Sequence, residues 1–282
     1  MDRNELEKYN VGENLDALMT LDPRGYGVCR ILYAGSRART GAPLTMAAAE
    51  ALCGELKEND PVFILTGFVL LPHKVPEMDG MVSSMLLCRA LVLAFNAKPI
   101  IICPEDSLEA IEKCANVVGL HIYRDVRTVM ELPLSMGVIP FTKDAGQAEA
   151  QSKAILSQVM PKAVISIEAP GANALGVYHN AVGKDVTELE AKTDALWERL
   201  RAMGVLNIAI GDLGNEIGMG AIKEHILRYI PFAAPGECAC GCGGGILAAT
   251  ETDHIITATC SDWGCYGMMA ALAYLKKNID IL

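Results

Sequence analysis

The stretch that decides the fold is LNIAIGDLGNEIGMG, residues Leu206–Gly220. An apolar run of strand length, Leu206–Ile210, passes through a glycine-rich turn into a helical pattern over Met219–Tyr229. Other apolar runs of this length alternate with helical patterns at Val62–Leu65, Pro99–Cys103, His121–Tyr123, Gly137–Pro140, Ala163–Ile167 and Ile255–Thr259. The alternation predicts an α/β fold: a doubly wound, mainly parallel sheet with helices on both faces, in three layers.

The helical period is clear in two segments. Leu44–Leu56 follows Pro43, and Glu188–Met203 places Leu189, Leu196, Leu200 and Met203 on one face. Residues 1–60 contain no convincing strand pattern, so we expect a helical cap there and a sheet core over residues 61–282, within a single domain. Further helices are expected at Met78–Ala97, Leu108–Val118, Lys143–Met160 and Gly264–Lys276.

Composition and charge restrict the class of function. The 282 residues are 51% hydrophobic and 5% aromatic, which suits helices on a buried sheet better than an all-β sandwich. The formal net charge is −10, so the surface should repel nucleic-acid phosphates and anionic lipids. We therefore expect neither a nucleic acid nor a membrane as a partner.

The polar N-terminal segment, the shortness of the apolar stretches and the scattered cysteines lead us to expect a cytoplasmic protein. Met1–Asn14 is mostly polar and has no apolar signal core, and the most apolar stretch, Met81–Phe95, is too short for a membrane span and carries Arg89. Most of the 10 cysteines are scattered through expected core segments, which argues against a disulfide scaffold.

Four unusual segments each follow an expected strand. They are Thr66-Gly67, Glu168–Gly171, Gly211–Gly220 and Ser261–Gly264. Because the carboxyl ends of parallel strands share one edge, where ligands bind in a crevice, we expect these segments to line one site.

Carboxylates dominate these segments. The turn Gly211–Gly220 fits neither a dinucleotide fingerprint nor a P-loop, and its Asp212 and Glu216 would repel a phosphate. Two carboxylates beside flexible backbone better suit a divalent cation or a substrate ammonium group. The alternative is a tight turn in which Glu216 is only a helix-start acid.

Further acids could join this edge. Glu168 ends a strongly apolar strand, where a carboxyl group is costly unless it is paired or exposed at the mouth of a site. Glu77 and Asp79 could enter the crevice or serve as N-terminal acids of the next helix. His179 is a candidate proton carrier, and Arg37 suits a carboxylate substrate if it is not simply a surface residue.

A cysteine cluster, Cys238, Cys240 and Cys242, stands apart from these segments. Three thiols in five residues could bind a soft metal or form a local disulfide. The paired C-x-x-C spacing of zinc sites is missing, no fourth ligand is evident, and an incidental glycine-rich loop is the alternative.

The same residues carry a resemblance to a known family. The stretches TGF (66–68), EMDG (77–80), IEAPG (167–171), IGDLGNEIGMG (210–220) and SDWG (261–264) resemble the D-glutamate cyclase-like C-terminal domain family, most specifically over Gly214–Gly220. The resemblance implies a carbon–oxygen lyase that reversibly cyclises D-glutamate to 5-oxo-D-proline with loss of water. Met78, Ala169 and Asp262 depart from the family's pattern.

These observations lead to one principal hypothesis and two alternatives. Glu168 or Glu216 would act as general base with Asp212 beside them, and backbone N–H groups of 214–220 and 261–264 would stabilise an oxyanion. Asp79, Asp212 and Glu216 would hold Mg²⁺ or Mn²⁺. One alternative is a non-catalytic domain that binds a small acidic metabolite and works with a partner subunit, and the other is a metal or redox protein built on the cysteine cluster. Under any of these hypotheses the chain could form a homo-oligomer or bind a partner subunit. The residues expected to bind substrate are Thr66, Gly67, Glu77, Asp79, Gly171, Gly214, Asn215, Gly218, Ser261, Asp262, Trp263, Gly264 and Arg37.

Overall fold

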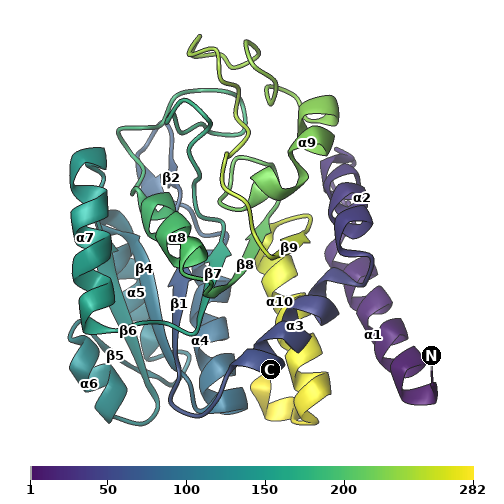
Figure 1. Ribbon diagram of the computed structural model, residues 1–282, viewed down its shortest axis with the longest axis vertical. Coiled ribbons are helices and arrows are strands. Elements are labelled where there is room, and N and C mark those ends of the chain that lie inside the picture. The colour runs from purple at the N-terminus through teal and green to yellow at the C-terminus, as the bar shows by residue number, and fades with distance from the viewer. Residues whose placement is uncertain (1) are drawn as a thin grey trace.

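A parallel sheet forms the centre of the computed structural model, which describes residues 2–282 (Figure 1). Within that range its strands lie in the order β5-β6-β4-β1-β7-β8-β9, and all neighbours run parallel. Each expected strand is found, so the predicted α/β architecture is confirmed. The strands are β1 (Pro61–Leu65), β4 (Lys98–Pro104), β5 (His121–Tyr123), β6 (Ser135–Phe141), β7 (Ala163–Ile167), β8 (Leu206–Gly211) and β9 (His254–Thr257).

Both faces of the sheet are buried, which explains why the strands are continuously apolar. In β1, Val62 and Ile64 enter the core on one face, while Phe63 and Leu65 enter the core on the other. A short antiparallel hairpin, β2 (Val69–Leu70) with β3 (Val75–Pro76), interrupts the loop after β1 and was not expected.

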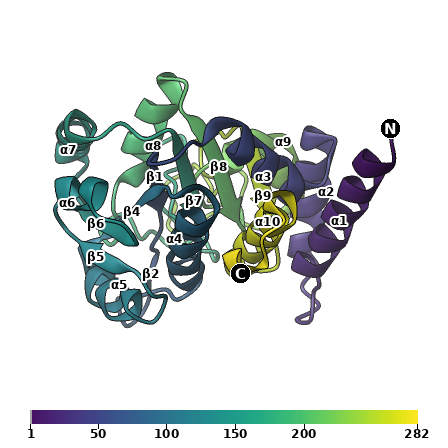
Figure 2. The same ribbon diagram turned by 90° about the horizontal axis from the view of Figure 1, so that it is seen from below.

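Helices cover the two faces as separate layers. Figure 2 shows α4 and α10 on one side of the strands and α7 and α8 on the other. The first layer contains α3 (Leu44–Glu55), α4 (Met81–Phe95), α5 (Leu108–Ala115) and α10 (Ser261–Lys276). The second contains α6 (Val126–Glu131), α7 (Ala145–Gln158) and α8 (Thr193–Ala202).

The N-terminal segment is helical, as predicted, and shares the core of the sheet. Met19 at the end of α1 (Arg3–Met19) and Leu52 of α3 lie in the same core as α4 and α10. Leu32 of α2 (Val28–Thr40) packs in a third apolar cluster with η2 (Met219–Ile222) and α9 (Lys223–Tyr229). The remaining turns are η1 (Glu105–Ser107) and η3 (Ile279–Ile281). None of the helices in the described range is long and apolar enough to cross a membrane.

The expected helix Glu188–Met203 begins later than its period predicts. In the structure α8 starts at Thr193, so Leu189 lies outside it, and Met203 is 54% exposed. The reason is the buried Lys192, whose ammonium group donates to the carbonyl oxygens of Thr187 and Glu190 and holds the preceding chain in a loop. A long loop, residues 168–192, therefore follows β7.

Candidate functional site: a carboxylate centre at the sheet edge

The expected acidic residues meet at the carboxyl ends of the strands, where the long loops gather at the top of Figure 1. Carboxylate oxygens of Asp79, Glu168 and Asp212 lie within 4.8 Å of one another. We call these three residues the carboxylate centre. They come from loops after β1, β7 and β8, so the prediction that these segments share one edge agrees with the geometry.

Two helix N-termini hold this centre through exchanged caps. Asp79, just before α4, accepts the backbone N–H groups of Ser261 (3.0 Å) and Asp262 (2.7 Å) at the start of α10. Asp262 in turn accepts those of Gly80 (2.9 Å) and Ser83 (3.1 Å) at the start of α4. Each acid thus caps the other's helix, and the positive ends of both helix dipoles point at the acidic site.

Close packing at Gly80 brings α4 against the end of β7. Gly80 has a φ of +76°, and a Cβ there would lie 2.5 Å from Glu168 Cβ and 2.7 Å from the carbonyl oxygen of Ile167. Glu168 itself has a φ of +47°, a conformation that non-glycine residues adopt at an energetic cost. Strain of this kind is typical of functional sites and turns the Glu168 side chain toward the centre.

Burial and mutual repulsion favour the protonated form of these acids. Glu168 is 5% exposed, and burial, followed by the charge of Asp212, raises its pKa well above the usual range. Burial and the charge of Glu216 likewise raise the pKa of Asp212. Ser261 Oγ donates to Glu168 Oε2 at 2.5 Å, which leaves Oε1 available to a ligand.

Glu216, expected from sequence as a cation ligand, lies outside the group of carboxylates that could hold an ion. It is fully buried, and its carboxylate accepts the backbone N–H groups of Asp212, Leu213 and Gly214, each at 2.6 Å. Glu216 therefore closes its own glycine-rich turn, and Glu168 takes its place beside Asp79 and Asp212. Because these three N–H groups already occupy its carboxylate oxygens, Glu216 is poorly placed to accept a proton as a general base.

Two buried polar atoms at the centre lack a hydrogen-bond partner among the described residues. Asp212 Oδ1 and Thr66 Oγ1 are buried and have no hydrogen-bond partner within the described residues. Thr66 Oγ1 would lie 3.0 Å from a Cβ at Gly80, which places it beside Glu168. Buried polar atoms normally find partners, so these atoms are suited to a bound ion, substrate or water.

No basic side chain of the described chain compensates for the acids. Across residues 2–282, neither lysine nor arginine forms an ion pair with Glu77, Asp79, Glu168, Asp212 or Glu216. Several buried carboxylates at this spacing cannot all ionise without a cation. Oxygen ligands of this kind fit Mg²⁺ or Mn²⁺, because hard cations prefer carboxylates.

Glu77 lies beside the centre with a pKa suited to proton transfer. Burial and the charges of Asp79 and Glu216 raise the pKa of Glu77 to about 7. Its backbone N–H donates to the carbonyl oxygen of Phe68 across the β2–β3 hairpin, which fixes its position. Expected from sequence only as a binding residue, Glu77 has the properties of a general acid or base near neutral pH.

Most of the backbone N–H groups that were expected to stabilise an oxyanion already have partners within the described residues. Those of Ile217, Gly218 and Gly220 donate to Ala169 O, Thr250 Oγ1 and Thr250 O. At the start of α10 the N–H groups are similarly occupied by Asp79 and by the carbonyl oxygen of Cys260.

Several expected binding residues have structural positions instead. Gly264 packs closely on Ile210, and the side chain of Trp263 lines an apolar pocket of about 310 Å³ between α1 and α10. Arg37 bonds to Tyr9 and Glu13 of α1 and is not brought to the carboxylate centre. The four expected glycines of the turns have backbone roles. The N–H groups of Gly67, Gly171 and Gly214 donate to Glu168 O, Asn215 O and the Glu216 carboxylate. Gly218 has a φ of +92°, which favours glycine.

A second group of buried polar residues was missed from sequence. Glu190 is fully buried, accepts the N–H of Val69 at 3.2 Å, and burial raises its pKa to about 8. Lys192 Nζ lies 4.4 Å from the ring centroid of Tyr178, whose hydroxyl donates to Asp194. The burial of Glu190, Lys192 and Asp194 could not be predicted from the sequence, because the periodicity of 188–203 predicts the start of a helix there.

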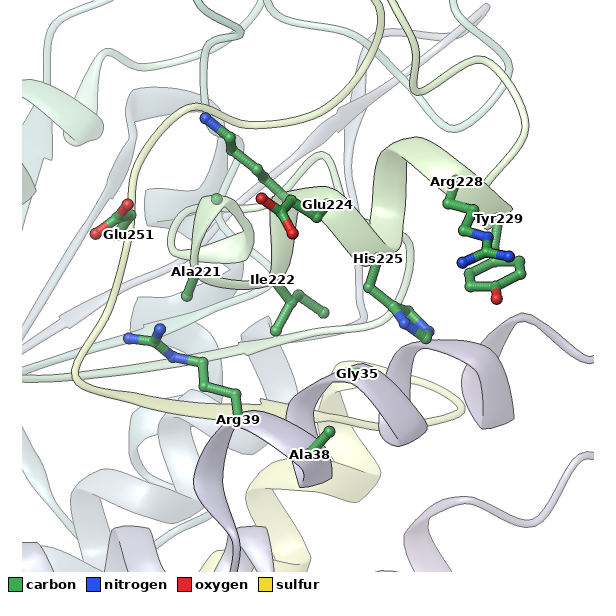
Figure 3. A pocket seen from close by; sticks show the side chains of 12 residues that line it. Gly35, Ala38, Arg39, Ala221, Ile222, Glu224, His225, Arg228, Tyr229 and Glu251 are labelled. Atoms are coloured by element: carbon green, nitrogen blue, oxygen red, sulfur yellow. The ribbon is translucent and has the colours of Figure 1, made fainter.

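A separate pocket of about 560 Å³ lies between α2 and α9 (Figure 3). Its lining includes Arg39, His225, Arg228 and Glu251 and none of the residues of the carboxylate centre. His225 Nε2 contacts the carbonyl oxygen of Ile31 at 2.6 Å, so this imidazole joins the two helices.

Fold and site together define an α/β protein whose buried carboxylates converge at the carboxyl edge of a parallel sheet. Residues 15–281 match the family described as D-glutamate cyclase-like, C-terminal, and the chain belongs to that family. It is 26% identical over 275 residues to the human protein named D-glutamate cyclase, mitochondrial. The match covers 93% of this chain and 38% of the human protein, so the chain spans well under half of that relative's length.

Proposed function

We propose that this chain is a lyase that interconverts D-glutamate with 5-oxo-D-proline and water at the carboxylate centre. The observation that carries the proposal is the convergence of Asp79, Glu168 and Asp212 within 4.8 Å, largely buried and without a basic partner among residues 2–282. Membership of the D-glutamate cyclase-like family supports this reaction class.

The centre's free lone pairs suit a divalent cation. Among the described residues, Asp79 Oδ2 accepts one backbone bond, Glu168 Oε1 none, and Asp212 Oδ1 none. Each residue can therefore present an oxygen to Mg²⁺ or Mn²⁺, whose charge would also lower the pKa of Glu168 and Asp212 and keep them ionised. When bound, the cation would polarise the distal carboxyl group of the substrate as a Lewis acid.

Proton transfer in this scheme belongs to Glu77. In cyclisation the substrate nitrogen forms a bond to the distal carboxyl carbon, one C–O bond breaks, and the oxygen leaves as water. The substrate nitrogen loses two protons, one from the ammonium group before attack and one after the C–N bond has formed, and the leaving oxygen takes up both. Burial raises the pKa of Glu77 above that of an ordinary carboxyl group, which favours Glu77 as the group that accepts these protons from the nitrogen and passes them to the leaving oxygen.

The acidic surroundings also favour an amino acid as substrate. Glu77 and the carboxylate centre attract an ammonium group, while the substrate's own carboxylates need the cation for binding.

The test is incubation of Mn²⁺-supplemented protein with D-glutamate, L-glutamate and both 5-oxoprolines, followed by chiral chromatography. We expect only the D-forms to interconvert, Glu77→Gln to bind Mn²⁺ without turnover, and Asp212→Asn to lose both. Stabilisation of the protein by these acids with no chemical change would instead indicate a binding domain.

A further inference from the structure

The cysteine cluster acquires a fourth member in the folded chain. His179 lies 61 residues before Cys240 in sequence, yet its Nε2 is 3.2 Å from Cys240 Sγ and 3.5 Å from Cys242 Sγ. Cys238 Sγ lies 3.4 Å from Cys242 Sγ and 3.6 Å from Cys240 Sγ. One ligand atom from each of the four residues falls within 4.8 Å of all the others.

These separations are close to those of a tetrahedral zinc site. With Zn–S of about 2.3 Å and Zn–N of about 2.0 Å, tetrahedral geometry separates two sulfurs by about 3.8 Å and a sulfur from a nitrogen by about 3.5 Å. The four distances between these ligand atoms, 3.2 and 3.5 Å from nitrogen to sulfur and 3.4 and 3.6 Å between sulfurs, equal these values or are slightly shorter. Cys260 and Cys265 are not in this group, and Cys265 Sγ donates to the carbonyl oxygen of Ser83 instead.

The groups around the cysteine sulfurs favour the thiolate form of these residues. Backbone N–H groups of Cys242 and Gly244 donate to the sulfurs of Cys240 (3.4 Å) and Cys242 (3.3 Å), and such bonds stabilise sulfur as the anion that binds metal. His179 is 1% exposed, and its Nδ1 has no hydrogen-bond partner among residues 2–282. A neutral imidazole with its proton on Nδ1 leaves the Nε2 lone pair free beside the sulfurs of Cys240 and Cys242.

Two loops must approach closely to build this cluster. A Cβ at Gly183 would lie 2.8 Å from the backbone nitrogen of Ala239, so the loop that follows β7 lies directly on the cysteine loop. The N–H of Cys240 donates to the carbonyl oxygen of Gly183, and Asn173 Nδ2 donates to that of Gly245. Contacts of this number would be unusual for an incidental glycine-rich loop.

We propose that His179, Cys238, Cys240 and Cys242 form a structural zinc site that ties together the two loops above the carboxylate centre. All four positions of a tetrahedral ion are filled by protein ligands, as in structural rather than catalytic zinc sites. Binding of Zn²⁺ would release the protons of the three thiols to solvent, with no change of oxidation state.

The site has a direct connection to the glycine-rich turn. The carbonyl oxygen of His179 accepts Asn215 Nδ2 at 2.8 Å, and Asn215 is the neighbour of Glu216. On the other loop, the N–H of Ala248 donates to the carbonyl oxygen of Gly214 at 3.1 Å. Zinc would therefore hold both loops against the turn that carries Asp212, without contacting the reacting groups.

The experiment measures zinc in the full chain by elemental analysis after expression in zinc-supplemented medium, and records the visible spectrum after exchange with Co²⁺. We expect one zinc ion per chain and the intense d–d bands of tetrahedral cobalt with thiolate charge transfer. Cys240→Ser alters the most exposed of the three thiols, and His179→Ala removes the histidine ligand. Both should lose most of the zinc.

Two matched variants serve as controls for the zinc measurement. Cys114→Ser removes a cysteine of α5 outside the cluster, and Asp212→Asn removes a carboxylate of the other centre; both should keep zinc. Wild-type protein that holds no zinc and takes up none on addition overturns the proposal, as does zinc that Cys240→Ser retains. A disulfide between Cys238 and Cys242 in freshly purified protein would overturn it too. The wild-type measurements decide the matter even if the ligand variants fail to fold.

Discussion

Replacing Glu216 with glutamine should destabilise the fold, because this carboxylate closes the turn after β8. An amide oxygen in place of Oε1 can still accept the N–H groups of Asp212 and Leu213. The amide NH2 in place of Oε2, however, faces the N–H of Gly214, a donor against a donor in a fully buried position. Losing one hydrogen bond to a charged acceptor costs about 1.5–3 kcal/mol, and removing a charge near other acids offsets part of that.

We therefore expect Glu216→Gln to lower the free energy of unfolding by about 2 kcal/mol, or the thermal midpoint by about 4–8 °C. The assay is urea denaturation followed by circular dichroism, with the exposed Glu224→Gln as a control that should stay within about 0.5 kcal/mol of wild type. A Glu216→Gln variant as stable as that control would refute the assignment of Glu216 to the turn. It would make this residue a candidate base again.

Three other substitutions test the site. Asp212→Asn should raise the thermal midpoint in the absence of divalent cations, because Asp212 repels its acidic neighbours and accepts no backbone hydrogen bond from the described residues. The same substitution should abolish the stabilisation of the protein by Mn²⁺. Scanning calorimetry with and without Mn²⁺ measures both effects, and an unchanged Mn²⁺-dependent shift of the midpoint would exclude Asp212 as a ligand. Gly80→Ala should lower the free energy of unfolding by about 2–4 kcal/mol, since its Cβ would collide with the end of β7. Gly119→Ala, also at positive φ but in open space, should lower it by only about 1 kcal/mol in the same urea titration. Equal losses would contradict the close approach of Gly80 to β7. The pKa of Glu77 in the folded state, about 7, lies above its ordinary value of 4.5, so its contribution to stability is full below about pH 4.5 and is lost as the pH rises through 7. Glu77→Gln should therefore flatten the curve of unfolding free energy against pH between these values. An unchanged slope would count against the raised pKa.

The strands and their common edge could be predicted because local sequence determines them. Strands buried on both faces are continuously apolar, and a loop that follows a parallel strand must lie at the carboxyl edge. Glu168 and Asp212 follow such strands directly, so their meeting is a consequence of topology and needs no knowledge of distant contacts.

What could not be predicted depends on contacts between distant segments. Whether Glu216 ligates a cation or closes its own turn depends on where three N–H groups point, and both arrangements have the same sequence. The helix period of 188–203 concealed a loop, because burial of Lys192 outweighs propensity there. No pattern in the sequence indicated that His179 lies beside the cysteine cluster, since only the folded loops bring them together.

The departures from the family pattern have partial explanations. Asp262 caps α4, a role for which a short carboxylate is well suited, and Ala169 is fully buried beneath the glycine-rich turn. Met78 is 56% exposed, and nothing in the structure explains a preference for methionine there.

The central claim is that the carboxylate centre is where substrate is converted, and one comparison tests it most directly. The initial rate of D-glutamate formation from 5-oxo-D-proline is measured with Mn²⁺ for wild-type protein and Glu168→Gln, each shown to be folded by circular dichroism. Glutamine can still accept the Ser261 hydroxyl, so the variant should fold while losing a cation ligand and nearly all turnover. A wild-type protein without turnover, or a folded Glu168→Gln variant with the wild-type rate, would contradict the claim.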